Sequence, residues 1–176
     1  CYVVELSSFQ LETTHHLAAE VACVLNMSED HMDRYDSMVT YYKAKHRVFQ
    51  GCRNIVINRE DTLSQPLVSR SMPKKSFGLQ MADNPVAIKN QYSIAWQNNA
   101  SGETNKHEFL MFEQQPIFPV AELKIKGRHN QLNVLAAIAL VESMPTDFKV
   151  SNEQLHQVLS DFTGLPHRCT WIAEHD

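Results

Sequence analysis

The chain has 176 residues, of which 43% are hydrophobic and 20% charged, and its formal charge is −4 at pH 7. This length suits one domain, or one domain and the edge of another, and the negative charge argues against a general nucleic-acid-binding surface. No apolar run approaches the roughly 20 residues of a membrane span. The four cysteines are scattered, which favours reduced thiols in a cytoplasmic protein.

The first part of the chain alternates between strand-like and helix-like segments. Short apolar runs rich in β-branched residues are typical of strands buried on both faces. Ser7 or Ser8 can cap the first helix, and Gly51 can end the second. This alternation predicts an α/β domain with a mostly parallel sheet flanked by helices. The strands are expected at 2–6, 21–26 and 53–58, and the helices at 7–17 and 37–51.

The second part of the chain changes character between residues 84 and 123. Short alternating segments separated by Asn, Gly and Pro predict a small antiparallel sheet attached to the main one. Two helices follow, at 127–144 and 151–162, the latter with Ser151 as its N-cap and Glu153 near the capping-box position. The antiparallel strands are expected within 86–97, 106–115 and 118–125.

The stretch SEDHMDRY, residues 28–35, carries the densest group of charged side chains. Ligands of open parallel sheets bind outside the carboxyl ends of the strands. Glu5 ends the first expected strand and this stretch follows the second, so Glu5, Asp30, His31 and Asp33 could share one crevice if the strands are neighbours. Carboxylates suit Mg²⁺, which takes few protein ligands besides waters and phosphates. The alternative is a solvated turn with Asp30 as a helix N-cap, which composition alone favours.

Three other features could carry chemistry. GRHNQLN opens the helix at 127–144, where free N–H groups either bind an anion or are simply capped. TGLPHR is a connector whose Arg168 could hold a phosphate. Lys45 lies on the apolar stripe of its helix, so it either extends its ammonium to water or is buried and reacts with an electrophile such as CO₂. No G-x-x-x-x-G-K-[ST] phosphate loop occurs in the sequence.

Taken in order, ELSSFQLE, LNMSEDHMDRY, YYKAK, GRHNQLN and FTGLPHR resemble the Mur ligase family. The ordered set spans residues 5–168, and its first two motifs are typical of the member that adds D-glutamate to UDP-N-acetylmuramoyl-L-alanine. The resemblance implies a P-loop-NTPase-like central domain in an ATP-dependent, ADP-forming ligase of bacterial peptidoglycan synthesis. In such an enzyme an acyl phosphate forms first, and the amine of D-glutamate then attacks it.

The resemblance also implies roles for the charged residues. Glu5 would hold the Mg²⁺ that bridges the ATP phosphates. His31 would be a ligand of a second Mg²⁺, and Lys45 matches the carbamylated lysine of the family, whose carbamate helps to organise that metal. Arg168 would reach the phosphates from a hinge to a further domain.

The binding residues implied by the same resemblance are polar. Ser7 and Gln10 would lie against the muramoyl substrate. His129, Asn130 and Asn133 would line the nucleotide pocket, with Asn133 nearest the adenine.

The resemblance predicts a central ATP-binding domain over 1–163, and a hinge with the start of a C-terminal domain over 164–176. The chain is expected to be a piece of a monomeric cytoplasmic enzyme. By itself it is expected to lack ligase activity, to bind ATP weakly, and to self-associate through apolar faces left bare. Turnover of ATP by the isolated chain would contradict this. The alternatives are a sibling ligase or folylpolyglutamate synthase, a metal-dependent hydrolase built on Asp30, His31 and Asp33, and a non-catalytic nucleotide-binding module.

Overall fold

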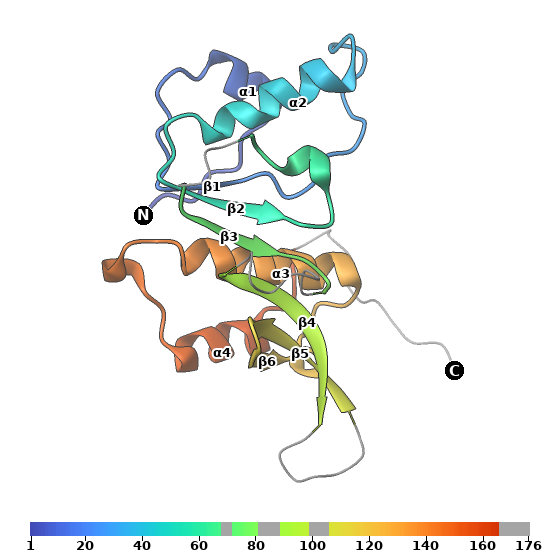
Figure 1. The fold of residues 1–176 in the computed structure, drawn as a ribbon, viewed down its shortest axis with the longest axis vertical. Helices are drawn as coiled ribbons and strands as arrows, with labels where there is room; N and C mark the ends of the chain where they lie inside the picture. The colour runs from blue at the N-terminus through green and yellow to red at the C-terminus, as the bar shows by residue number, and fades with distance from the viewer. Residues whose placement is uncertain (68–71, 81–88, 99–105, 166–176) are drawn as a thin grey trace.

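The computed structural model describes residues 1–67, 72–80, 89–98 and 106–165 (Figure 1). One six-stranded mixed sheet, with its strands in the order of the sequence, forms the centre of the molecule. The helices are α1 (Ser8–Thr13), α2 (Met38–His46), α3 (Arg128–Val141) and α4 (Asn152–Asp161). The strands are β1 (Val21–Cys23), β2 (Asn54–Asn58), β3 (Lys74–Phe77), β4 (Gln91–Asn98), β5 (Lys106–Phe112) and β6 (Gln115–Pro119).

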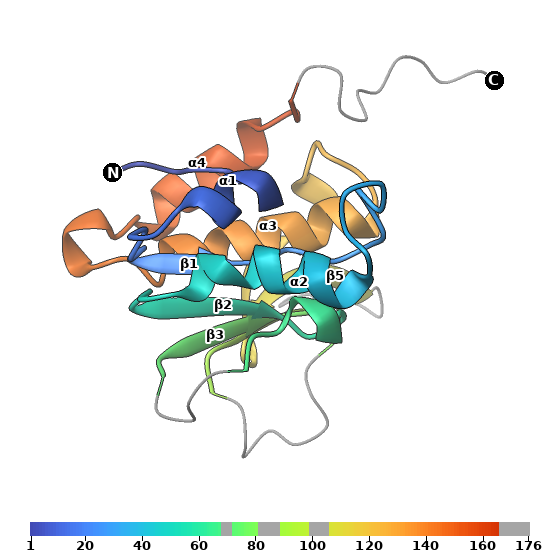
Figure 2. The same ribbon diagram turned by 90° about the horizontal axis from the view of Figure 1, so that it is seen from above.

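The pairing of the strands confirms the expected fold class. β1, β2, β3 and β4 pair in parallel, whereas β4, β5 and β6 form an antiparallel meander. The antiparallel strands are therefore a continuation of the main sheet through β4. α1 and α2 lie on one side of the parallel strands and α3 on the other (Figures 1 and 2).

Alternating side chains of the parallel strands fill two separate cores. Val21 and Cys23 pack with Val56 into the large cluster covered by α3 and α4. Ala22 and Ile55 point to the opposite side, where they pack with Phe49 and Val48 of the 3₁₀ helix Arg47–Phe49, which follows α2, and with Cys52. Side chains of a strand alternate between the two faces of its sheet, so apolar residues on both faces give the uninterrupted run that predicted a doubly buried strand.

The strand expected at residues 2–6 is wrong. This segment has no regular secondary structure, and the side chains of Tyr2 and Val3 are 96% and 98% exposed. A strand is stabilised by backbone hydrogen bonds to a neighbour and by burial of its side chains, and the sheet ends at β1 without pairing to this segment. An apolar run indicated the propensity for a strand but not its partner.

Three other expectations need correction. The strand β3 was not predicted, because its sequence KKSF lacks an apolar pattern. The segment 118–125 is only briefly extended, since β6 ends at Pro119 and a 3₁₀ turn follows. The capping box of α4 uses Gln154 rather than Glu153. The C-terminal stretch WIAEHD, whose apolar start is also typical of a strand, lies outside the described residues.

The helix ends follow the local signals of the sequence. Ser7, Ser37 and Ser151 each accept a hydrogen bond from the backbone three residues later and close a capping box. Gly51, just beyond the 3₁₀ helix that follows α2, has a φ of +70°, a conformation that glycine adopts at little cost. Among the described helices, none has the length and hydropathy needed to cross a lipid bilayer.

Candidate active site

Helix α3 packs on the parallel strands and runs in the direction opposite to theirs. Lys75, the second residue of β3, donates from Nζ to the carbonyl oxygen of Glu142, the C-cap of α3, at 2.6 Å. The last turn of α3 therefore lies at the amino ends of the strands, and its first turn lies toward the edge where β1, β2 and β3 end, as in Figure 1. We call the edge where β1, β2 and β3 end the carboxyl edge. Two segments that were predicted as candidates for ligand binding lie at this end of the sheet. They are the loop after β1 and the first turn of α3.

Polar side chains at the end of β2 fix the start of the loop after β1. Asn58 donates from Nδ2 to the carbonyl oxygen of Leu25 at 2.8 Å. The carboxylate of Asp61 accepts a hydrogen bond from the backbone N–H of Met27 on one oxygen and from that of Leu63 on the other. These bonds hold residues 25–27 against the carboxyl edge, so the charged stretch that follows starts from a fixed point.

Ser7 and Gln10 form the N-terminal cap of α1. Ser7 Oγ accepts from the N–H of Gln10 at 3.2 Å, and Gln10 Oε1 accepts from the N–H of Ser7 at 2.8 Å. The structure thus brings these two predicted substrate residues together, on the element that also carries Phe9. A substrate that bound either side chain would compete with the cap.

His31 has a backbone conformation that few side chains adopt. Its φ is +55°, in the left-handed region where Asn, Asp and His are enriched among non-glycine residues. Asp30 accepts the backbone N–H of His31 at 2.8 Å, and its other carboxylate oxygen lies 3.4 Å from His31 Nε2. The imidazole side chain is 42% exposed, so it is open to a ligand as well as held by its neighbours.

An aromatic cluster of Phe9, Tyr35 and Tyr41 surrounds one side of His31. The ring centre of His31 lies 4.9 Å from that of Phe9 and 6.3 Å from that of Tyr41. Tyr35 stacks on Phe9 at 6.1 Å and packs on Tyr41 at 5.2 Å. The cluster thereby joins α1, the loop of residues 28–35 and α2. The cluster could not be predicted from the sequence, because its members are spread over three elements.

Arg34 closes the other side of the aromatic cluster. Its guanidinium carbon lies 5.0 Å from the ring centre of Phe9, and its Nη2 donates to Glu12 at 2.7 Å. The hydrogen bond from Arg34 lowers the pKa of the Glu12 carboxyl. An ion pair and a cation–π contact therefore fix the loop to α1 from outside.

Lys45 lies one helical turn after Tyr41, so the two side chains share one face of α2. Lys45 is half-buried, which fits its predicted place on the apolar stripe. Two residues later, Arg47 donates to the carbonyl oxygens of Leu11 at 2.7 Å and Thr14 at 3.0 Å. These bonds hold the end of α1 against the 3₁₀ helix that follows α2. Lys45 and His31 are therefore held by neighbouring elements, since α2 carries Lys45 and also contacts His31 through Tyr41.

The first turn of α3 has the features expected of a site for an anionic ligand. Gly127, its N-cap, has a φ of +94° and supplies no side-chain cap. A Cβ atom at this position would lie 2.9 Å from His129 Cε1, so only glycine fits without displacing the imidazole. Asn130 donates from Nδ2 to the carbonyl oxygen of Lys126 at 2.8 Å. His129 and Asn133 are exposed and four residues apart, which places them on one face of the helix.

Two predicted site residues are not part of this assembly. Glu5 lies in the N-terminal segment without regular structure, where it is exposed, so its predicted position at a strand end is wrong. Arg168 lies outside the described residues. Across residues 1–67, 72–80, 89–98 and 106–165, no three His, Cys, Asp or Glu side chains converge to hold a metal ion.

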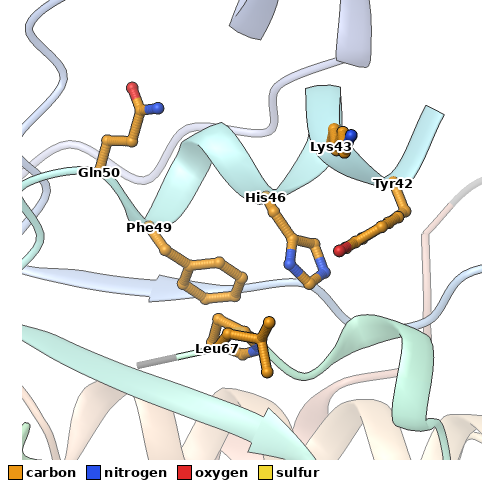
Figure 3. A pocket seen from close by; sticks show the side chains of 7 residues that line it. Tyr42, Lys43, His46, Phe49, Gln50 and Leu67 are labelled. Atoms are coloured by element: carbon orange, nitrogen blue, oxygen red, sulfur yellow. The ribbon is translucent and has the colours of Figure 1, made fainter. Parts of the chain in front are cut away.

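Two surface hollows lie near α2. One, of about 320 Å³, has His46 at its centre, with its Nε2 at 2.8 Å from the carbonyl oxygen of Leu63 (Figure 3). Burial lowers the pKa of His46. This hollow is lined by Tyr42, Lys43, His46, Phe49, Gln50, Pro66 and Leu67, and the second, of about 290 Å³, by Glu12, Arg34, Tyr35, Asp36 and Thr40. Neither contains a predicted site residue, so the candidate site is an open surface rather than one of these hollows.

Comparison with known proteins now identifies the family. The model of the Mur ligase middle domain matches residues 1–141. The chain belongs to the Mur ligase family. It is 46% identical over 175 residues to the UDP-N-acetylmuramoylalanine–D-glutamate ligase of Pseudomonas savastanoi pv. phaseolicola, covering 99% of the chain and 36% of that relative. The enzyme of the same name from Pseudomonas putida is 47% identical over 175 residues, covering 99% of the chain and 35% of the relative.

A solved Mur ligase has the same fold. The structure of UDP-N-acetylmuramoyl-L-alanyl-D-glutamate–2,6-diaminopimelate ligase aligns with 97% of this chain and 34% of its own, with a TM-score of 0.69 and 23% sequence identity. This likeness confirms the α/β fold with a mostly parallel sheet. The chain spans about a third of the length of the curated Mur ligases that it matches.

Proposed function

We propose that this chain is part of an ATP-dependent ligase that joins D-glutamate to UDP-N-acetylmuramoyl-L-alanine in bacterial peptidoglycan synthesis. The observation that carries the proposal is the 46% identity, over 99% of the chain, to relatives named for this activity. Residues 1–163 would belong to the central ATP-binding domain, and 164–176 would form the hinge and the start of the next domain. The cytoplasm, where ATP is available, is the proposed location.

The proposed reaction has two steps. The alanyl carboxylate attacks the γ-phosphate of ATP, which releases ADP and gives an acyl phosphate. The amine of D-glutamate then attacks the acyl carbon, inorganic phosphate leaves, and the amine loses a proton as the amide forms. Reactants and transition states in both steps carry several negative charges, so positioning and charge neutralisation are the main contributions that a protein can make.

The nucleotide would bind at the first turn of α3. Backbone N–H groups at a helix N-terminus attract phosphates, and Gly127 permits a close approach of the chain. His129 and Asn133 lie on one exposed face of this turn, where Asn133 would contact the adenine. Asn130 would line the same pocket, and Arg168 would add a positive charge from the hinge.

Magnesium would be held by residues at the carboxyl edge. When bound, it would neutralise phosphate charge. His31 and a carbamate on Lys45 would offer a nitrogen and oxygen donors from neighbouring elements. Glu5 lies apart from them on the exposed N-terminal segment, and its carboxylate would have to approach from there. Because Mg²⁺ keeps several waters and binds phosphates directly, one or two protein ligands are enough, and these donors fit such an ion.

The muramoyl substrate would bind beside α1. Ser7 and Gln10 would contact it, and the alanyl carboxylate would then lie toward His31, whose ring packs against Phe9 of the same helix. The two carboxylate oxygens of Asp30 fix the backbone N–H and the ring of His31. These contacts would set the orientation of the imidazole before any ligand binds.

The test uses the product of the complete reading frame with ATP, UDP-N-acetylmuramoyl-L-alanine and D-glutamate. We expect phosphate release that requires both acceptor substrates, and a loss of turnover on the order of 100-fold in His31→Ala. His107→Ala, an exposed histidine on β5, is the matched control and should leave turnover unchanged. Turnover with diaminopimelate in place of D-glutamate would indicate a sibling ligase, and phosphate release without an amino acid would indicate a hydrolase. Either result would contradict the proposal.

A further inference from the structure

Trp96 interrupts an otherwise buried face of the sheet. Tyr92, Ile94 and Trp96 alternate along β4 and therefore point to the same side, toward α3. Tyr92 and Ile94 are buried in the large core, whereas Trp96 is 61% exposed. The side chain of tryptophan is large and flat, and aromatic rings gain stability by stacking on another flat ring. The end of this face therefore presents a bare aromatic ring.

The contacts of Glu108 place this ring beside the first turn of α3. Trp96 pairs with Glu108 across the β4–β5 hairpin, so their side chains lie next to each other on one face. Glu108 accepts a hydrogen bond from Nη2 of Arg128, the first residue of α3, at 2.6 Å. Arg128 also donates to Gln131 at 2.9 Å. The ion pair of Glu108 with Arg128 thus joins the hairpin to the start of α3.

We propose that Trp96 is a stacking surface for the purine base of the nucleotide that binds at the first turn of α3. The inference rests on the proposed function and adds to it a residue that determines how the base is held. A flat base fits an exposed indole, while the phosphates lie toward the backbone N–H groups of the helix. Because Glu108 neutralises Arg128, the pair serves to position the hairpin, and the indole provides the contact with the ligand.

The experiment measures binding of ATP and of inorganic tripolyphosphate to the product of the complete reading frame by calorimetry. The variants are Trp96→Ala, Trp96→Phe and, as the matched control, Phe148→Ala, an exposed aromatic residue beyond the opposite end of α3. We expect Trp96→Ala to weaken ATP binding about 5- to 50-fold and Trp96→Phe to weaken it less than about 3-fold, since phenylalanine still stacks. Tripolyphosphate has no base, so its affinity should be the same in all four proteins.

Each result decides the matter. Unchanged ATP affinity in Trp96→Ala would overturn the inference and leave the proposed function intact. An equal loss of ATP and tripolyphosphate affinity would also overturn it, because the substitution would then disturb the helix start rather than a contact with the base. Failure of the unsubstituted protein to bind ATP would reject the nucleotide site of the proposed function, and the stacking role with it.

Discussion

The two sides of the parallel sheet are held together by different means. On the α3 side, one cluster of buried apolar residues from β2 to α4 forms a continuous core. On the α2 side, the buried apolar residues fall into two smaller clusters, one under the 3₁₀ helix and one around Tyr35 and Tyr41. Hydrogen bonds and an ion pair that involve Arg47, Arg34 and Asp61 add further connections there.

This difference in packing separates the side that stabilises the fold from the side that carries most of the candidate site. Hydrophobic cores are close-packed and resist local opening, whereas elements held by few apolar contacts open at lower free energy. His31, Lys45, Ser7 and Gln10 all lie on the α2 side. The α3 side contributes the first turn of its helix and, in the proposed nucleotide site, Trp96. We infer that the α3 side provides most of the stability of the domain, and that the α2 side can adjust more easily to a bound ligand.

The largest expected effect is on the α3 side. Leu135→Ala removes a fully buried side chain from the centre of α3 and should lower the free energy of unfolding by about 2 to 5 kcal/mol. Urea denaturation followed by circular dichroism measures this change. Ala137→Ser, on the exposed side of the same helix, is the control and should change the free energy by less than about 0.5 kcal/mol. A small effect of Leu135→Ala would remove the distinction between the two sides.

A smaller and local effect is expected at the α1 docking site. Arg47→Met removes two charged hydrogen bonds to the end of α1 and should lower the free energy of opening of this helix by about 1.5 to 3 kcal/mol. Hydrogen exchange at the Leu11 amide, which is bonded to Ser7, reports this opening. Amides of α3 should keep their protection. Arg53→Met removes an exposed ion pair to Glu20 and should change neither helix. Equal loosening of α1 and α3 would show that the sides unfold as one unit.

The elements that could be predicted from the sequence carry their own local signals. Serine caps mark the starts of α1, α2 and α4, and the doubly buried runs mark β1 and β2. β3 could not be predicted, because its four residues KKSF become a strand only by pairing with β2 and β4. The reverse holds for residues 2–6, which have the pattern of a strand but no partner in the sheet.

Only part of the candidate site could be predicted from the sequence. The position of His31 after a buried strand follows from the rule for parallel sheets, and the structure holds it at that edge. The contacts around His31 join residues 9, 31, 35 and 41, and nothing in their spacing indicates that these rings meet. Glu5 was misplaced because its position depended on a strand that does not form.

The ion pair of Glu12 with Arg34 gives the α2 side a pH dependence. Because the hydrogen bond from Arg34 lowers the pKa of Glu12, the pair stabilises the folded cluster at pH values above about 4.5, the ordinary value for glutamate. This stabilisation is lost as the pH falls below that value through the lowered pKa. Nuclear magnetic resonance signals of Phe9 should shift over this range, and Glu12→Gln should abolish the shift. Glu29→Gln, in the exposed loop, should leave it unchanged. A shift that persists in Glu12→Gln would assign the transition to another group.

The smallest expected effect is the absence of a modification. A carbamate forms from a neutral amine and CO₂ and persists where cations surround it, and in the described part of this chain no metal-binding group of side chains lies near Lys45 to provide them. We therefore expect Lys45 of the isolated chain to remain unmodified in ¹³C-bicarbonate, with no carbamate signal by nuclear magnetic resonance. A signal that disappears in Lys45→Arg but persists in Lys43→Arg would contradict this. It would mean that the α2 side, by its own packing, already holds the lysine in the modified state assigned to it in the proposed reaction.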